Sequence, residues 1–249
     1  MQVAYGFLGY RGVEQRNVTC MIEFLGHCSA RGVPALVVPH GNDALVGRAR
    51  GILARKFMET DGDVLLCVDS DIVFRPDDAW RVCEAAMEKD IVAGLYVTRT
   101  RKGGITTSRL FPNTSYDFSQ VTLHEIKWAG GGFVAIHRRV FETLKRHKQI
   151  ELVHQGTDLE HWTYYRTFAV DEEPDGRIEL GEDWAVCERA REMGYRVWLD
   201  TGVRLGHLGM HEYTLEDLLA VPRQRVLALR QASDNTLKVS VAEQLQEVA

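Results

Sequence analysis

The first hundred residues alternate between strand-like and helix-like segments, and this alternation limits the possible folds more than any other feature of the chain. Short apolar runs are separated by segments whose apolar residues recur at helical spacing, which is typical of a parallel sheet with crossover helices. The pattern predicts strands at 3–8, 35–38, 64–68 and 91–97 and helices at 14–29, 42–58 and from residue 76. Asn42 is the expected N-cap of the second helix. We therefore expect an α/β fold with a mostly parallel central sheet flanked by helices.

The second half of the chain follows a less regular pattern. Residues 105–127 predict short strands with turns, and a strand at 133–136 leads into a helix at 139–146. A helix at 182–193 and a strand at 196–199 follow. The polar and aromatic segment 154–176 has the length of a lid, a binding loop or a disordered segment. We expect one domain over 1–220, with halves 1–100 and 101–220, and an amphipathic helical tail over 221–249.

Composition excludes several broad classes of protein. The 249 residues are 45% hydrophobic, which is ample for a core, yet no apolar stretch has the length of a membrane span. The N-terminus lacks the features of a signal peptide, so we expect a cytoplasmic protein. The five cysteines are odd in number and never spaced CxxC, which favours reduced buried thiols. A net charge of −5 with mixed signs argues against broad binding of duplex nucleic acid.

Two carboxylates, Asp69 and Asp71, follow the apolar strand predicted at 64–68. Two carboxylates that lie close together where a strand leaves the hydrophobic core repel each other and lose hydration, which is costly unless a cation neutralises them. Mg²⁺ or Mn²⁺ carrying a diphosphate would satisfy both, because hard cations take carboxylate and phosphate oxygens together. The alternative is a turn in which Asp and Ser cap the backbone.

A second acidic pair, Glu182 and Asp183, stands at the start of the predicted helix 182–193. Acidic residues favour helix N-termini because of the helix dipole, so simple capping explains them equally well. The functional alternative is a general base that takes a proton from an acceptor hydroxyl.

His207 lies between glycines just past the strand predicted at 196–199. A neutral imidazole is a good ligand for Mn²⁺, although a histidine in this setting is more often structural. His207 and His211 have the spacing of a zinc pair on a helix, but Gly209 weakens a helix there.

Weaker candidates for ligand contacts lie elsewhere. Arg48 and Arg50, at the start of the second helix, can reach a phosphate or a nucleotide, since helix N-termini bind anions. Tyr10 and Arg11 follow the first strand and could contact a base. The glycine run 130–132 would let a substrate approach the backbone, or it is a bulge.

These pieces together resemble the glycosyltransferases of the GT-A fold, most closely bacterial and phage members of the family-2-like group. The resemblance covers roughly residues 1–210 and rests on an ordered set of segments: Leu65-Leu-Cys-Val-Asp69-Ser-Asp71-Ile, Gly130-Gly-Gly-Phe133-Val, Gly181-Glu-Asp-Trp184-Ala-Val-Cys187, Gly194-Tyr-Arg-Val-Trp198 and Gly206-His207-Leu-Gly209. The order of the set is much more specific than the DxD pattern alone.

The resemblance implies a metal-dependent transfer of a sugar from a nucleotide-diphospho-sugar to an acceptor hydroxyl, with Mn²⁺ or Mg²⁺ at the diphosphate. By this likeness, Asp71 and His207 match the metal ligands, and Asp69 matches the residue that contacts ribose and sometimes metal through water. Asp183, or failing that Glu182, matches the catalytic base of inverting members. The remaining matched positions contact the donor or lie near the sugar: Arg48, Arg50, Gly131 and Gly132.

The chain also departs from parts of the family. It has neither the membrane segments of processive polysaccharide synthases nor their QxxRW-type motif, since residues 222–225 do not match it. The acceptor stays open among a glycan, a lipid-linked sugar, a protein and a modified base, and so does a homo-oligomer formed through the tail.

Two other functions are weighed against transfer. A sugar nucleotidyltransferase would carry a glycine-rich loop with Arg and Lys after the first strand, which Gly9-Tyr-Arg-Gly12 matches poorly. A catalytically inactive binding or virion-associated module would have lost one of the matched carboxylates or the histidine, and all are present. A nicotinamide enzyme is disfavoured because no GxGxxG follows the first strand.

Overall fold

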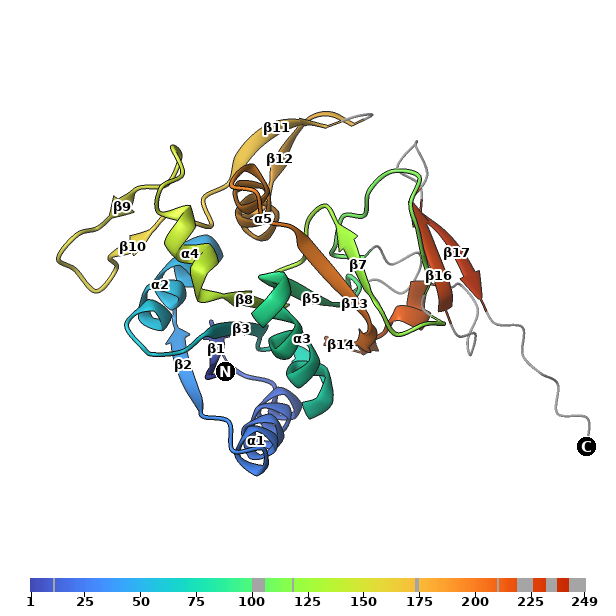
Figure 1. The fold of residues 1–249 in the computed structure, drawn as a ribbon, viewed down its shortest axis with the longest axis horizontal. Helices are drawn as coiled ribbons and strands as arrows, with labels where there is room; N and C mark the ends of the chain where they lie inside the picture. The colour runs from blue at the N-terminus through green and yellow to red at the C-terminus, as the bar shows by residue number, and fades with distance from the viewer. Residues whose placement is uncertain are drawn as a thin grey trace, which may run out of the picture.

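The computed structural model describes residues 1–10, 12–99, 106–117, 119–172, 175–209, 211–218, 226–231 and 237–241. Its centre is a seven-stranded sheet in the order β2-β1-β3-β8-β5-β13-β7 (Figure 1). The strands in that order are Ala35–Gly41, Val3–Gly9, Val64–Asp69, Phe133–His137, Ile91–Leu95, Val197–Arg204 and Leu123–Ile126. Strands β2, β1, β3, β5 and β13 run in one direction, whereas β8 and β7 run the opposite way. The expected mostly parallel sheet is confirmed, and strands from both halves of the chain build it.

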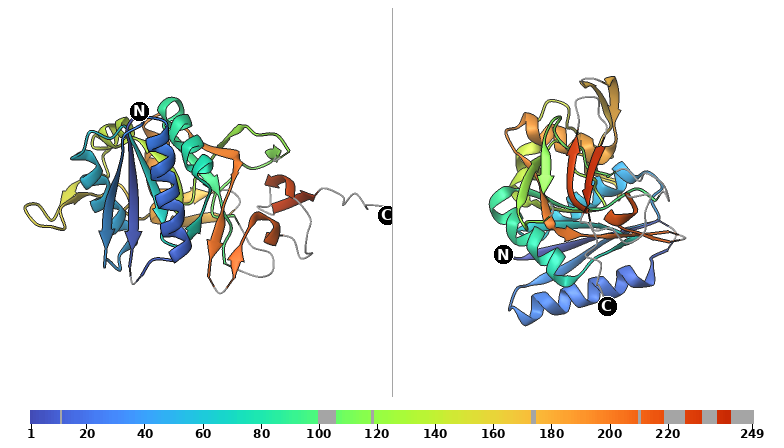
Figure 2. Two further views of the ribbon diagram at one scale, coloured as in Figure 1. Left: turned by 90° about the horizontal axis from the view of Figure 1, so that it is seen from below. Right: turned by 90° about the vertical axis from the view of Figure 1, so that its right-hand side faces the viewer.

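Five helices flank the sheet among the described residues: α1 Gln15–Ala30, α2 Val46–Met58, α3 Pro76–Lys89, α4 Arg138–Leu144 and α5 Glu182–Glu192. The β3 strand shows how the two layers form, because its side chains alternate between faces. Leu66 and Val68 join the core under α1 and α3, whereas Leu65 and Cys67 join the core under α2, α4 and α5. Figure 2 shows α1 along one face of the sheet.

The start of α2 differs from the prediction. The helix begins at Val46, and Asn42 lies before it with a positive φ of 60°. Asn42 therefore forms a bend directly after β2 rather than the helix cap. Asp43 accepts a hydrogen bond from the Leu45 backbone N–H at 3.0 Å instead, which orders the chain just before the helix.

Short strands occupy the segment expected to be one long loop. The pairs are β9 Leu152–Val153 with β10 His161–Trp162, and β11 Phe168–Glu172 with β12 Gly176–Leu180. The prediction missed them because β10 and β11 lie inside the aromatic segment, whereas their pairing partners β9 and β12 lie outside it or at its edge. The first pair packs beside α2.

The C-terminal prediction is wrong where the structure describes it. Val226–Gln231 and Leu237–Val241 form strands β16 and β17, and β16 also pairs with β6, Ser115–Asp117. In β17 the apolar residues Leu237, Val239 and Val241 alternate with polar ones, which is strand spacing rather than helical spacing. No helical tail remains in the described part to support an oligomer interface.

The remaining small elements lie near the end of β13. They are β4 Ile72–Val73, β14 Gly206–Leu208, β15 Glu212–Tyr213 and the short 3-10 helix Leu215–Leu218. Strand β14 pairs with β4 and β15 in antiparallel fashion, which brings His207 beside Ile72. In the part of the chain that the structure describes, no helix has the length and apolar character needed to cross a membrane.

Candidate functional site

The turn that carries Asp69 and Asp71 is held by hydrogen bonds from three parts of the chain. The Asn17 side-chain amide, on α1, donates to the carbonyls of Asp69 and Ile72 at 3.0 and 2.7 Å. The carbonyl of Ser70 accepts from the backbone of residue 14, and that of Asp71 accepts from the backbone of residue 208. All four carbonyls of residues 69–72 are therefore occupied, so the backbone that carries both carboxylates is held in place.

His207 faces Asp71 across the β4–β14 pair. Its Nδ1 lies 2.7 Å from the Val97 carbonyl, and its Nε2 lies 3.4 Å from Asp71 Oδ2. A carbonyl can only accept, so Nδ1 carries a proton. Nε2 then either carries a second proton and donates to Asp71, or presents its lone pair to a cation that Asp71 shares.

Arg99 is the third group at this carboxylate, with Nη1 3.0 Å from Asp71 Oδ2. Burial raises the pKa of Asp71, but the hydrogen bond from His207 and the charge of Arg99 outweigh it, so the pKa lies below its usual value. The surroundings of Asp71 thus favour its ionised form, and the ionised carboxylate attracts positive charge.

These residues fit a divalent cation in their chemistry, although no group of three or more His, Cys, Asp or Glu ligands is assembled within the described ranges. Asp71 supplies a carboxylate oxygen and His207 an imidazole nitrogen whose tautomer is set by a backbone carbonyl. Phosphate oxygens and water commonly complete such open sites. His211, the other half of the considered zinc pair, instead has its Nε2 3.6 Å from Asp217, and the described residues around it form strands β14 and β15 rather than a helix.

The glycine run 130–132 lies directly over Asp69. The Gly132 N–H donates to the Tyr96 hydroxyl at 2.8 Å, and the Gly131 N–H donates to Asp183 Oδ2 at 3.0 Å. A Cβ on Gly132 would come within 2.6 Å of that hydroxyl and 3.1 Å of Asp69 Oδ2. Glycine is required here because backbone, hydroxyl and carboxylate crowd one small volume.

The first turn of α5 places its two carboxylates differently. Asp183 accepts from the backbone N–H groups of Gly131 and Trp184, so both of its oxygens are held. Glu182 lies 3.6 Å from Arg50 Nε. Burial and the neighbouring charge of Asp183 raise the pKa of Glu182, against the opposing effect of Arg50.

Arg50 contacts one carboxylate of each acidic pair, Asp69 and Glu182. Its side chain is only 3% exposed, and it donates to Asp69 Oδ1 and to the Gly131 carbonyl, both at 2.8 Å. Burial alone would lower the pKa of Arg50, but the charges of Asp69 and Glu182 raise it, so it stays a cation. The expected direct contact with a donor is therefore not available to Arg50, which instead fixes the carboxylates.

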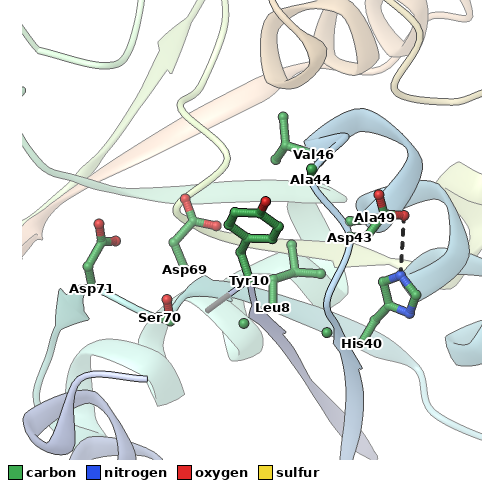
Figure 3. Close-up of a pocket in the computed structure, with 12 residues that line it drawn as sticks. Leu8, Tyr10, His40, Asp43, Ala44, Val46, Ala49, Asp69, Ser70 and Asp71 are labelled. Atoms are coloured by element: carbon green, nitrogen blue, oxygen red, sulfur yellow. Dashed lines mark ion pairs between the residues drawn. The ribbon is translucent and has the colours of Figure 1, made fainter. Parts of the chain in front are cut away.

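A cavity of about 250 Å³ opens at the carboxyl ends of β1, β2 and β3 (Figure 3). These ends lie level, since Leu8 pairs with Asp69 and Gly9 with Gly41. Its lining residues are Leu8, Gly9, Tyr10, His40, Gly41, Asp43, Ala44, Val46, Ala49, Asp69, Ser70 and Asp71. In open α/β sheets, ligands bind at this edge of the sheet, so the predicted carboxylates and Tyr10 share the expected place.

Arg48 does not line this cavity. It makes a two-bond pair with Asp43, from Nε and Nη2, each at 2.8 Å, and the pKa of that carboxyl falls to about 2 because of the hydrogen bonds from Arg48. His40 lies on the other side of Asp43 at 3.6 Å. Arg11, the remaining predicted contact, lies outside the described residues.

Several residues of the site were not predicted, among them Asn17, Tyr96 and Arg99. Tyr96 packs edge-on against His207, with ring centroids 5.3 Å apart. Each acts on residues far away in the sequence, so no local pattern marks it. Only the position of Tyr96 at the end of a predicted strand offered a signal.

Comparison with known proteins supports the architecture. The sequence matches no family model and no curated protein sequence. A197 from STIV aligns with 99% of this chain and 100% of its own, at a TM-score of 0.51 and 17% identity. GalNAc-T7, solved with UDP, GalNAc and Mn²⁺, aligns with 87% of this chain and 44% of its own, at a TM-score of 0.52 and 12% identity. The chain has the GT-A-like glycosyltransferase fold that its sequence predicts.

Proposed function

We propose that the chain is a metal-dependent glycosyltransferase that moves a sugar from a nucleotide-diphospho-sugar to an acceptor hydroxyl. The observation that carries this proposal is the cavity at the ends of β1, β2 and β3, which has Asp69 and Asp71 at one side and His207 facing Asp71. The same general fold in GalNAc-T7 accommodates UDP, GalNAc and Mn²⁺, which makes a UDP-sugar with Mn²⁺ the first donor to test.

Each matched residue has a role that fits its surroundings. Asp71 and His207 would hold the cation, and Asp69, fixed by Arg50, would bind the ribose. Tyr10 is half exposed at the cavity wall, where its ring can stack on a base. When bound, the cation supplies positive charge that stabilises the departing diphosphate.

The acceptor proton goes to a carboxylate at the start of α5, with inversion at the sugar carbon. Asp183 is our first candidate for this base because it lies over the glycine run 130–132, whose backbone N–H orients it. Glu182 is the second candidate. A positioned base contributes about 10²–10⁴-fold to such a reaction.

Two substitutions test these roles separately. Asp71→Ala should remove Mn²⁺-dependent release of UDP from UDP-sugars and leave the fold intact. Asp183→Asn should keep UDP binding and slow turnover by at least about 100-fold. The assay is nucleotide release from UDP-, GDP-, dTDP- and CMP-sugars with Mn²⁺, Mg²⁺ or EDTA.

Asp77→Ala is the matched control, since this carboxylate lies on α3 away from the cavity and is largely exposed. It should behave as wild type. Metal-dependent turnover that survives Asp71→Ala would refute the metal assignment. Unchanged turnover in Asp183→Asn would move the base to another residue, Glu182 first.

A further inference from the structure

A second cavity, of about 530 Å³, lies between the start of α2 and the β9–β10 pair. Its walls are Ala44, Leu45, Val46, Gly47, Arg48, Val153, His154, His161, Thr163, Tyr165, Arg166, Thr167 and Glu182. Two glycines of α2 set this wall. A Cβ on Gly51 would meet the His161 ring at 2.5 Å, and a Cβ on Gly47 would meet the Tyr165 carbonyl at 2.8 Å.

This cavity adjoins the one that holds Asp69 and Asp71. The two share Ala44 and Val46 in their walls. They are also connected through Arg50, which pairs with Asp69 of the first cavity and Glu182 of the second. A molecule in the second cavity therefore lies next to Glu182, the first carboxylate of α5.

The charged side chains on its walls already have partners of opposite charge. Arg48 pairs with Asp43 at 2.8 Å, Arg166 with Glu151 at 2.5 Å, and Glu182 with Arg50. A charged ligand would compete with these existing partners for the charged groups of the wall.

The uncharged part of the wall combines apolar surface with hydrogen-bonding groups. Leu45 is 60% exposed, and Val46 beside it is also exposed. Thr167 offers a hydroxyl, whereas the hydroxyl oxygen of Thr163 already accepts from the Glu151 backbone N–H at 3.1 Å. Burial lowers the pKa of His161, which favours the neutral ring, and its Nδ1 lies 2.7 Å from the Leu159 carbonyl, which leaves Nε2 as the nitrogen that can accept a hydrogen bond. Apolar patches with hydroxyls and imidazole suit the C–H faces and hydroxyls of a sugar.

We propose that the second cavity binds the acceptor and that the acceptor is an uncharged carbohydrate. This rests on the proposed function. In the reaction, the acceptor oxygen bonds to the sugar carbon, the bond from that carbon to the diphosphate oxygen breaks, and the nucleoside diphosphate leaves. The acceptor proton passes to the carboxylate at the start of α5.

The test uses a substitution that fills only the second cavity. Leu45 lines the second cavity and not the first, so Leu45→Trp adds bulk where the acceptor would lie. Ile22→Trp on α1 is the control, because Ile22 is equally exposed, at 61%, and lines neither cavity. Saturation-transfer NMR measures binding of glucose, galactose, mannose, N-acetylglucosamine and lactose, and of glucuronic acid and glucose 6-phosphate. UDP with Mn²⁺ is titrated separately for each protein.

We expect at least one neutral sugar to bind wild type and Ile22→Trp, and Leu45→Trp to weaken it about tenfold or more while UDP affinity is unchanged. Equal sugar binding by Leu45→Trp would place the acceptor elsewhere. Binding of only the anionic sugars, or of no sugar by a folded protein, would overturn the ligand class. A third outcome is that Leu45→Trp weakens sugar binding but no protein binds UDP. This would support the cavity as a carbohydrate site and contradict the proposed transferase function.

Discussion

The Asn17 amide reaches from α1 to the turn between β3 and β4, where it spans the carbonyls of Asp69 and Ile72. Asn17 is fully buried, so these carbonyls cannot exchange it for water without a local opening. This bridge helps to hold the turn that carries Asp69 and Asp71, and α1 therefore contributes to the site without touching a ligand.

Loss of this bridge should weaken both the fold and the site. Asn17→Ala leaves two carbonyls short of a donor, so we expect a loss of about 2–3 kcal/mol in the free energy of unfolding. Chemical denaturation measures it. Thr19→Ala is the control on the same helix, because its exposed hydroxyl donates only to the Gln15 carbonyl. A loss below about 0.5 kcal/mol for Asn17→Ala would show that the bridge contributes little.

At the residue scale, sequence patterns located the carboxylates but not their neighbours. Asp71 and His207 were predicted to act together, and the structure brings them within 3.4 Å. Arg48 and Arg50 were predicted to act alike, but residues two apart lie about 200° apart around a helix. Arg48 therefore pairs with Asp43, whereas Arg50 is buried under Asp69.

At the scale of elements, α2 is shaped by what packs on it. Gly47 and Gly51 stand four residues apart on one helical face, and that face receives residues 161–165. Helix propensity alone would favour alanine at both positions. Their presence indicates that close approach of the β10 segment outweighs helix propensity.

Alanine substitutions at Gly51 and at Gly26 should therefore change the stability of the protein in opposite directions. Gly51→Ala places a methyl group 2.5 Å from the His161 ring and should destabilise the protein by about 1–3 kcal/mol. Gly26→Ala in α1 meets nothing within 4 Å and should stabilise it by about 0.5–1 kcal/mol. Thermal unfolding of both variants checks this. Stabilisation by Gly51→Ala would mean that β10 does not rest on α2.

Elements with strong local periodicity were predicted well, whereas those defined by distant pairing were not. The strand at 64–68 and the helix from Pro76 match β3 and α3 closely. The β9–β10 and β11–β12 pairs are held by partners across turns, and the described tail residues pair with β6. Pairing between distant segments, such as β6 with β16, leaves little trace in a local window of sequence, and strands as short as β9 and β10 give little alternation to detect.

At the scale of the whole molecule, two apolar cores on opposite faces of one sheet account for the arrangement. All five cysteines lie in these cores as free thiols, as their spacing predicted: Cys20, Cys28, Cys67, Cys83 and Cys187. Burial raises the pKa of each, for example to about 11 at Cys67.

The thiols should therefore report global unfolding. We expect Ellman's reagent to react negligibly with native protein at pH 7.5 and with all five thiols in denaturant. The absorbance at completion gives the number of reacting groups. Rapid reaction of one thiol in native protein would show that a core opens locally, and fewer than five in denaturant would indicate a disulfide.

The most direct test of the central proposal is the melting temperature of wild type and Asp71→Ala with UDP in the presence of Mn²⁺ or EDTA. A ligand that binds only the folded state must stabilise it, by about 2.7 kcal/mol at 100 times its Kd. For a chain of this size we predict a rise of roughly 5–10 °C for wild type with UDP and Mn²⁺. The rise should vanish with EDTA and in Asp71→Ala. An equal rise in EDTA or in Asp71→Ala, or none in any condition, would contradict the proposed metal–nucleotide site.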